Sequence, residues 1–154
     1  MYLIKEPSSS FLYFYRMQTF QKNERLCGKI TIDNLFTNGS SIKDSIFRLV
    51  WNTEEFHNEI IVQTLIVVPK KNIKNAANRN ILKRRVREAF RIYKSCLYAK
   101  INSKKKQLAI AIIYQEQEIL PYNVIEEKIK LKTGYTTGSS ATAAAKAALL
   151  SIIN

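Results

Sequence analysis

Residues 69–106 read PKKNIKNAANRNILKRRVREAFRIYKSCLYAKINSKKK. This stretch holds 14 lysines and arginines against one acid, Glu88, so it accounts for the whole net charge of +13 of the 154-residue chain. The remaining 116 residues are electrically balanced. Charge that served solubility alone would have no reason to gather in one segment. Its concentration indicates a site for a polyanion.

The centre of this stretch has the periodicity of an amphipathic helix. At about 100° per residue, one face of this helix is apolar and the face beside it is basic. The apolar positions are Leu82, Val86, Ala89, Phe90, Tyr93, Cys96 and Leu97. The basic positions within roughly a third of the circumference are Lys83, Arg84, Arg87, Arg91 and Lys94, with Arg79 and Asn80 in the first turns.

A solvated surface is the ordinary alternative for a charged helix face. Such faces usually mix charges of both signs, whereas like charges at this spacing repel one another. Glu88 is the only acid in the stretch that could relieve the repulsion. A DNA-reading helix would need side chains that recognise base edges, and lysines and arginines in one row are better suited to phosphates. RNA or another folded polyanion is therefore the preferred partner.

The pattern of this helix resembles the signature of the protein subunit of bacterial ribonuclease P. That signature runs RN-x-x-KR-x-x-RE-x-x-R, and residues 79–91 contain every element of it. Residues 68–71, VPKK, are similar to the strand end that precedes the helix in that family. The sequence differs from many family members at one position, where Ile81 replaces a second Arg that is common there. The resemblance covers roughly residues 20–132.

The hydrophobic pattern predicts an α+β fold in a single small domain, with the order α-β-β-α-β-α. We expect a helix at 29–37, strands at 45–52 and 59–69, the basic helix from residue 76, a strand at 107–114 and a helix at 121–131. The 59–69 strand is apolar on both faces, which is typical of a central, covered strand. The basic helix then joins two apolar strands in a β-α-β crossover. Such crossovers are almost always right-handed, but the resemblance implies the left-handed kind.

No catalytic or metal site is predicted from the residues. The sequence shows no paired carboxylates with a cleft signature, no nucleophile motif and no metal-ligand cluster. Cys27 and Cys96 are far apart, and His57 is the only histidine, so a protein-held zinc is not expected. No apolar run approaches the ~20 residues that would span a membrane. We therefore expect a cytoplasmic protein without membrane contact.

The resemblance implies an RNA–protein enzyme that removes the 5′ leader of precursor tRNA. It implies that the RNA subunit performs the hydrolysis with Mg²⁺ held mainly by RNA, and that one protein copy assists. Ribonuclease P RNA and precursor tRNA are the implied partners. By position, the RNA-binding residues are Arg79, Asn80, Lys83, Arg84, Arg87 and Arg91, with Lys70 and Lys71 as additional phosphate partners. The alternative is another RNA-binding protein of the same fold, such as a ribosomal protein, without a role in tRNA cleavage.

Aromatic residues of the first helix line a cleft for the single-stranded leader in that family. Phe36 matches such a position, and Ile32 matches another where an aromatic residue is common. Trp51 is a third candidate for this cleft, although a tryptophan in a strand is more often part of the core. Aromatic faces stack on unpaired bases without sequence preference.

The two ends of the chain differ from the predicted domain. We expect residues 1–19 to be a disordered N-terminal extension, and MQTFQKNERL from Met17 resembles a family start. We expect residues 133–154 to form an atypical tail with an Ala-rich helix. Its segment GYTTGSSA is similar to the opening of the cobalt-precorrin methyltransferase of cobalamin synthesis, with Ser140 where Cys is usual. A truncated fusion and an ordinary linker with an extra helix both remain open.

Overall fold

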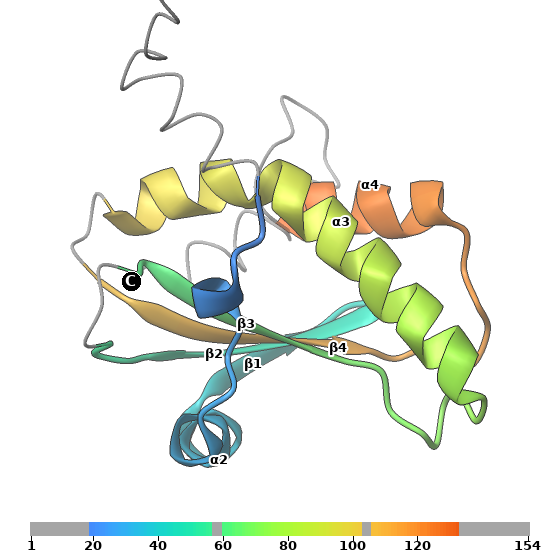
Figure 1. The fold of residues 1–154 in the computed structure, drawn as a ribbon, viewed down its shortest axis with the longest axis horizontal. Coiled ribbons are helices and arrows are strands. Elements are labelled where there is room, and N and C mark those ends of the chain that lie inside the picture. The colour runs from blue at the N-terminus through green and yellow to red at the C-terminus, as the bar shows by residue number, and fades with distance from the viewer. Residues whose placement is uncertain (1–18, 57–59, 103–105, 133–154) are drawn as a thin grey trace, which may run out of the picture.

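The computed structural model describes residues 19–56, 60–102 and 106–132. These residues form a four-stranded sheet with two helices on one face and one helix on the other (Figure 1). Helices α3 (Ala76–Asn102) and α4 (Tyr122–Lys132) pack against each other over the first face. Helix α2 (Lys29–Asn38) lies on the second. The predicted α+β class is confirmed.

The sheet has the order β1-β2-β4-β3. Its strands are β1 (Ser40–Lys43), β2 (Phe47–Thr53), β3 (Val62–Val67) and β4 (Leu108–Tyr114). Strand β4 pairs antiparallel with β2 and parallel with β3, so β3, α3 and β4 form the predicted β-α-β unit. The predicted element order is confirmed with one short strand, β1, in addition. The left-handed turn of the crossover stays a prediction.

Strand β3 lies at the edge of the sheet, and its predicted central position is wrong. Strand β3 is apolar on both sides because helices cover both faces of the sheet. A strand can be covered in this way and still lie at the edge, with a neighbouring strand on one side only. Residues 25 and 26 partly close this edge. Arg25 forms a parallel bridge with Thr64, and the Leu26 backbone N–H donates to the Thr64 carbonyl at 3.1 Å.

Alternating side chains of each strand enter two separate clusters, as the pleat of a strand requires. The larger cluster lies beneath α3 and α4. From β2 it takes Phe47, Leu49 and Trp51, which confirms the predicted alternation. The smaller cluster lies beneath α2 and consists of Leu26, Leu35, Val50, Ala109 and Ala111.

Helix α3 begins after Asn75, whose side-chain oxygen accepts from the backbone N–H groups of Ala77 and Asn78 at 2.8 and 3.4 Å. This capping satisfies donors that the first helical turn leaves unpaired. The predicted apolar face is confirmed, since Leu82, Val86, Ala89, Phe90 and Leu97 are all buried. The opposite side of α3 is thereby turned to solvent over the first half of the helix.

Candidate nucleic-acid interface

Three cations of α3 form a row at the border between the core and the solvent. Lys83 and Arg87 are half-buried, and Arg84 is exposed. We call these three residues the basic ridge; Asn80, also exposed, lies on the turn before it. In the described part of the chain no carboxylate forms an ion pair with any of the three. The ridge can therefore accept phosphates without breaking salt bridges.

Arg87 has the most unusual environment of the ridge. Burial lowers the pKa of its guanidinium, and the positive charges of Arg25 and Arg84 lower it further. Its Nε atom is buried and has no hydrogen-bond partner within the described residues. Like charges held together in this way favour an anion as a shared counter-charge. Arg25 lies outside the predicted site, because it is far from α3 in the sequence.

Arg91 carries an acidic partner on its own helix. Its guanidinium meets the Glu88 carboxylate at 2.6 and 2.9 Å, which raises the pKa of Arg91 and lowers that of Glu88. The side chains are 31% and 50% exposed, so the pair is a surface salt bridge of modest strength. Arg91 thus contributes less free positive charge to this surface than the three residues of the ridge.

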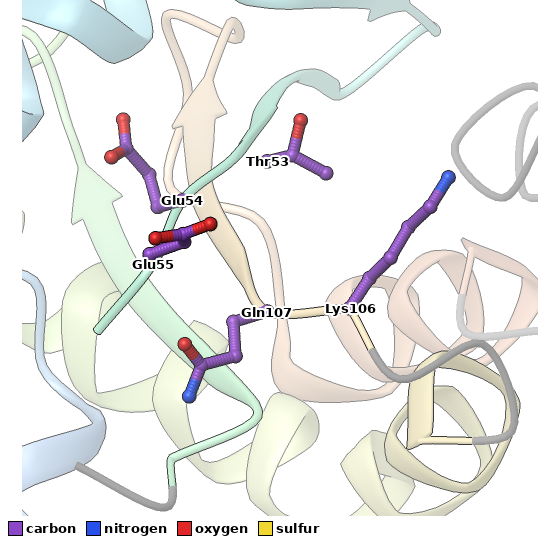
Figure 2. A pocket seen from close by; sticks show the side chains of 5 residues that line it. All are labelled: Thr53, Glu54, Glu55, Lys106 and Gln107. Carbon is purple, nitrogen blue, oxygen red and sulfur yellow. The ribbon is translucent and has the colours of Figure 1, made fainter. Parts of the chain in front are cut away.

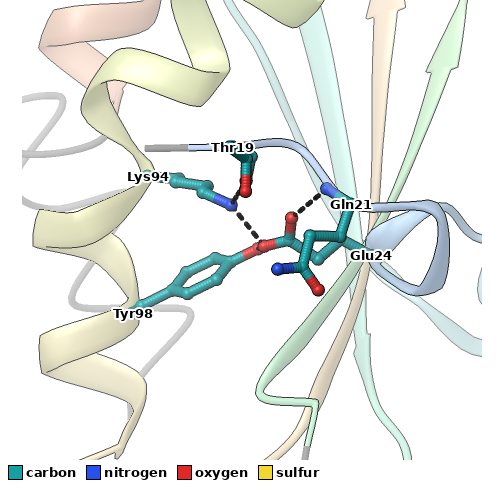
Figure 3. A network of polar contacts seen from close by, with 5 residues as sticks. All are labelled: Thr19, Gln21, Glu24, Lys94 and Tyr98. Carbon is teal, nitrogen blue, oxygen red and sulfur yellow. Dashed lines mark hydrogen bonds and ion pairs between the residues drawn. The ribbon is translucent and has the colours of Figure 1, made fainter. Parts of the chain in front are cut away.

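Lys94 was predicted beside the ridge, and the structure corrects this. Its side chain is 1% exposed, and its ammonium group lies 2.5 Å from Glu24 Oε1 and 2.5 Å from the Thr19 carbonyl oxygen (Figure 3). Burial lowers the pKa of Lys94, while the Glu24 carboxylate opposes that shift. The position on the helix is as expected. Lys94 is buried because residues 19–26, which we call the N-terminal strap, cover this part of α3.

The cations that precede the ridge have two different roles. Arg79 donates from Nη1 to the carbonyl oxygens of Ile73 and Lys74 at 3.0 and 2.7 Å, so it holds the loop that leads into α3. Lys70 and Lys71 are exposed in the turn after β3. That turn is closed by backbone bonds from residues 72 and 73 to the Pro69 carbonyl. Both lysines are therefore accessible to a phosphate backbone.

The three candidates for the leader cleft do not lie together. On α2, Ile32 is half-buried against the smaller cluster and Phe36 is 48% exposed. Trp51 is 7% exposed and belongs to the larger cluster, on the opposite face of the sheet. As folded, Trp51 cannot stack on a base, and its assignment to the cleft is corrected. Phe36 remains the accessible aromatic of this group.

An open pocket lies where β2 ends and β4 begins (Figure 2). It is lined by Thr53, Glu54, Glu55, Lys106 and Gln107. Figure 2 shows the Lys106 side chain extending away from both carboxylates. The Asn34 amide already donates to Glu54 at 2.5 Å, and Gln107 accepts from the Phe56 backbone at 2.7 Å. Among the described residues no group of three or more His, Cys, Asp or Glu side chains could hold a metal ion.

The chain that carries this surface matches a known protein family. The family model described as Ribonuclease P matches residues 20–130, which is well over half of the chain. The chain belongs to the ribonuclease P family. The predicted resemblance to this family is confirmed, and the function is that of the protein component of ribonuclease P, in tRNA processing. No helix among the described residues is long and apolar enough to span a membrane.

Curated relatives and solved structures agree with this family. The chain is 28% identical over 109 residues to the ribonuclease P protein component of Porphyromonas gingivalis, covering 71% of this chain and 80% of that protein. It is 30% identical over 106 residues to that of Chlorobium phaeobacteroides, covering 64% and 73%. The RNase P proteins of Staphylococcus aureus and Thermotoga maritima share the fold, with TM-scores of 0.56 and 0.57. Their identities are 20% and 24%, and the matches cover 70% and 74% of this chain and 89% and 98% of those chains.

A second family model, CbiD, matches residues 124–154. The match begins within α4 and continues into residues 133–154, which lie outside the described residues. The predicted N-terminal extension likewise lies outside them, apart from residue 19. The origin of the two ends stays a prediction.

Proposed function

We propose that the chain binds the RNA subunit of ribonuclease P through the basic ridge, Asn80 and the exposed lysines before α3. The observation that carries this proposal is a row of cations without carboxylate partners, in the described residues, on the helix that bears the family signature. Phosphate contacts of this kind set position and affinity without reading sequence. Arg79 and Arg91 would contribute at either end, the first mainly by shaping the loop.

The chain would also bind the 5′ leader of precursor tRNA at the α2 side of the sheet. Phe36 offers an exposed aromatic face there, and Ile32 borders it. Each stacked base contributes about 1–3 kcal/mol and needs no particular sequence. Hydrolysis would reside in the RNA subunit, with one copy of this protein assisting.

Magnesium would be held mainly by the RNA. The described carboxylates offer no cluster for a divalent ion, and Mg²⁺ binds protein through only one or two carboxylates when phosphates supply the other ligands. The protein side chains would therefore act on binding and orientation. They would lower the Mg²⁺ concentration that folding and substrate binding require, because they neutralise phosphates in its place.

The test mixes the purified chain with ribonuclease P RNA and precursor tRNA at an Mg²⁺ concentration too low for the RNA alone. Release of the 5′ leader only when the protein is present supports the proposal. Tight binding to ribosomal RNA without any stimulation of leader release would instead favour an RNA-binding protein of another kind. A variant that lacks residues 133–154 shows in the same assay whether the tail contributes.

A further inference from the structure

The N-terminal strap runs between α3 and the edge of the sheet that β3 forms. Figure 1 shows it in blue, passing from the level of α3 down past the sheet toward α2. Its short 3-10 helix η1 (Lys22–Glu24) is closed by a capping box, in which the Glu24 carboxylate accepts from the Gln21 backbone at 2.6 Å. Beyond η1, Arg25 forms a parallel bridge with Thr64 of β3, and the Leu26 backbone N–H donates to the Thr64 carbonyl. The strap is therefore fixed to both neighbours.

A buried polar cluster joins the strap to α3. Glu24 Oε1 accepts hydrogen bonds from the Lys94 ammonium group at 2.5 Å and from the Tyr98 hydroxyl at 2.8 Å (Figure 3). We call Glu24, Lys94 and Tyr98 the clasp. Phe20 packs edge-on against Phe90 beside it, with ring centroids 6.1 Å apart. Moving the strap away from α3 would separate Glu24 from Lys94 and leave the Lys94 charge buried without its counter-charge, which is strongly unfavourable. The clasp therefore holds the strap in one position on the helix.

That position brings Arg25 to the basic ridge. Arg87 precedes Lys94 by seven residues and Tyr98 by eleven, so all three lie along one side of α3. Glu24 contacts two of them, and Arg25 follows it directly. Arg25 also pairs with Thr64, which is in register with Ile110 of the cluster beneath α3. Paired residues point to the same face of a sheet, and the Arg25 side chain is therefore on the α3 side.

The electrostatics of Arg87 agree with this placement. Both Arg25 and Arg84 are close enough to oppose its charge, and no carboxylate among the described residues compensates. Arg25 from the strap and Arg84 from α3 thus both lie near Arg87. An anion bound between these arginines would reduce their mutual repulsion. Phosphate suits such a site because one guanidinium can donate hydrogen bonds to two phosphate oxygens at once.

We propose that Arg25 completes a phosphodiester-binding site with Arg84 and Arg87, and that the clasp is the positioning device that places Arg25 there. The inference rests on the proposed function, because the phosphodiester would be one of the RNA subunit. It adds a strap residue, remote in sequence from the signature helix, to the RNA-binding surface. Glu24 acts through Arg25 and touches no RNA itself.

The first test measures the affinity for ribonuclease P RNA over a range of salt concentrations. Arg25→Ala should weaken binding roughly tenfold and reduce the slope of log affinity against log salt by about one. Lys22→Ala is the matched control, since it removes an exposed cation of the same strap that does not act on Arg87. It should leave affinity within about twofold of the wild type.

The outcomes separate the two proposals. If the wild type fails to bind this RNA, the proposed function is wrong and the inference falls with it. If the wild type binds and Arg25→Ala matches it in affinity and salt slope, the inference alone is overturned. Equal losses in Arg25→Ala and Lys22→Ala would also overturn it, since they would show a general effect of charge.

The second test concerns the clasp. If Glu24 acts by positioning Arg25, Glu24→Gln should lose most of the affinity that Arg25→Ala loses, and the double variant should lose little more. Additive losses would overturn the positioning role. Circular dichroism at the assay temperature establishes that each variant is folded. The Arg25→Ala measurement leaves the clasp intact, so it decides on the site even if Glu24→Gln does not fold.

Discussion

The ammonium nitrogen of Lys94 lies 2.5 Å from Glu24 Oε1, and the two side chains are 1% and 10% exposed. One of the cations in the basic stretch is thus used inside the protein, to attach the N-terminal strap to α3. The cations of the basic ridge, by contrast, are half-buried or exposed. The same helix therefore serves both as part of the core and as a polyanion surface.

Breaking this pair from one side should destabilise the fold strongly. Glu24→Gln leaves the Lys94 charge buried without its counter-charge, which costs about 3–5 kcal/mol in the free energy of unfolding. The double variant Glu24→Leu with Lys94→Met should be closer to the wild type than Glu24→Gln, because neither charge then remains. Urea unfolding of the three proteins measures this. A double variant that is less stable than the single one would contradict it.

Tyr98 should make stability fall at high pH. Burial, the Glu24 charge and the hydrogen bond to Glu24 raise the pKa of its hydroxyl far above the ordinary value near 10. Above pH 10 the unfolded chain loses this proton while the folded protein keeps it, so stability decreases as pH rises. The wild type should lose up to about 1.4 kcal/mol more per pH unit than Tyr98→Phe. Unfolding measurements from pH 9 to pH 11 test this, and parallel pH profiles would contradict it.

Removing two cations of the ridge should weaken RNA binding without unfolding the protein. In Lys83→Ala with Arg87→Ala, the slope of log affinity against log salt should fall by roughly two, since about one counterion is released per phosphate contact. The thermal midpoint should change little, because Arg87 is opposed by neighbouring charges and its Nε has no partner in the described residues. Lys22→Ala with Lys128→Ala is the control of equal charge. RNA affinity equal to that of the wild type would refute the assignment.

Phe36 should matter for single-stranded RNA and little for folding. Its side chain is 48% exposed, and Phe36→Ala should weaken binding of a precursor tRNA with a leader by about 1–3 kcal/mol. Binding of the same tRNA without a leader should not change. Ile30→Ala, on the same helix and 86% exposed, is the matched control.

Trp51→Ala should instead cost about 3–5 kcal/mol of stability, because it leaves a cavity in the core.

Gly39 should resist substitution, since it lies where α2 turns into β1. A Cβ atom there would be 2.2 Å from the Leu35 carbonyl oxygen and 3.0 Å from that of Trp51, and neither backbone atom can move freely. Gly39→Ala should cost about 1–3 kcal/mol or more in stability. At Gly28 the nearest atom is Thr31 Oγ1 at 3.4 Å, so Gly28→Ala should cost less than about 1 kcal/mol. Equal thermal midpoints would contradict this.

The sequence predicts most of this fold because its helices and strands have clear periods. The apolar positions of α3 recur at helical spacing, and those of β2 alternate, so both could be assigned from local order. The strand β1 was missed because Ser40–Lys43 has too few apolar residues for a strand pattern. Its pairing is supplied by β2 rather than by its own sequence.

The candidate site could be predicted only in part. The signature residues 79–91 are local in sequence, and their helix arranges them without help from other segments. The burial of Lys94, the core position of Trp51 and the approach of Arg25 to Arg87 depend on which segments pack together. No periodicity within a single element contains that information. A pairing between Glu24 and a cation of α3 could be found only from contacts far apart in the chain.

Strand β4 lies between β2 and β3, although it follows both in the chain. Within the described residues, every strand pairing that joins the β1–β2 hairpin to β3 runs through residues 108–114. A nascent chain on the ribosome that stops before Leu108 therefore has a hairpin and a separate strand with nothing between them. Completion of the sheet must wait for the last strand to be synthesised, so the protein acquires its RNA-binding shape late in translation.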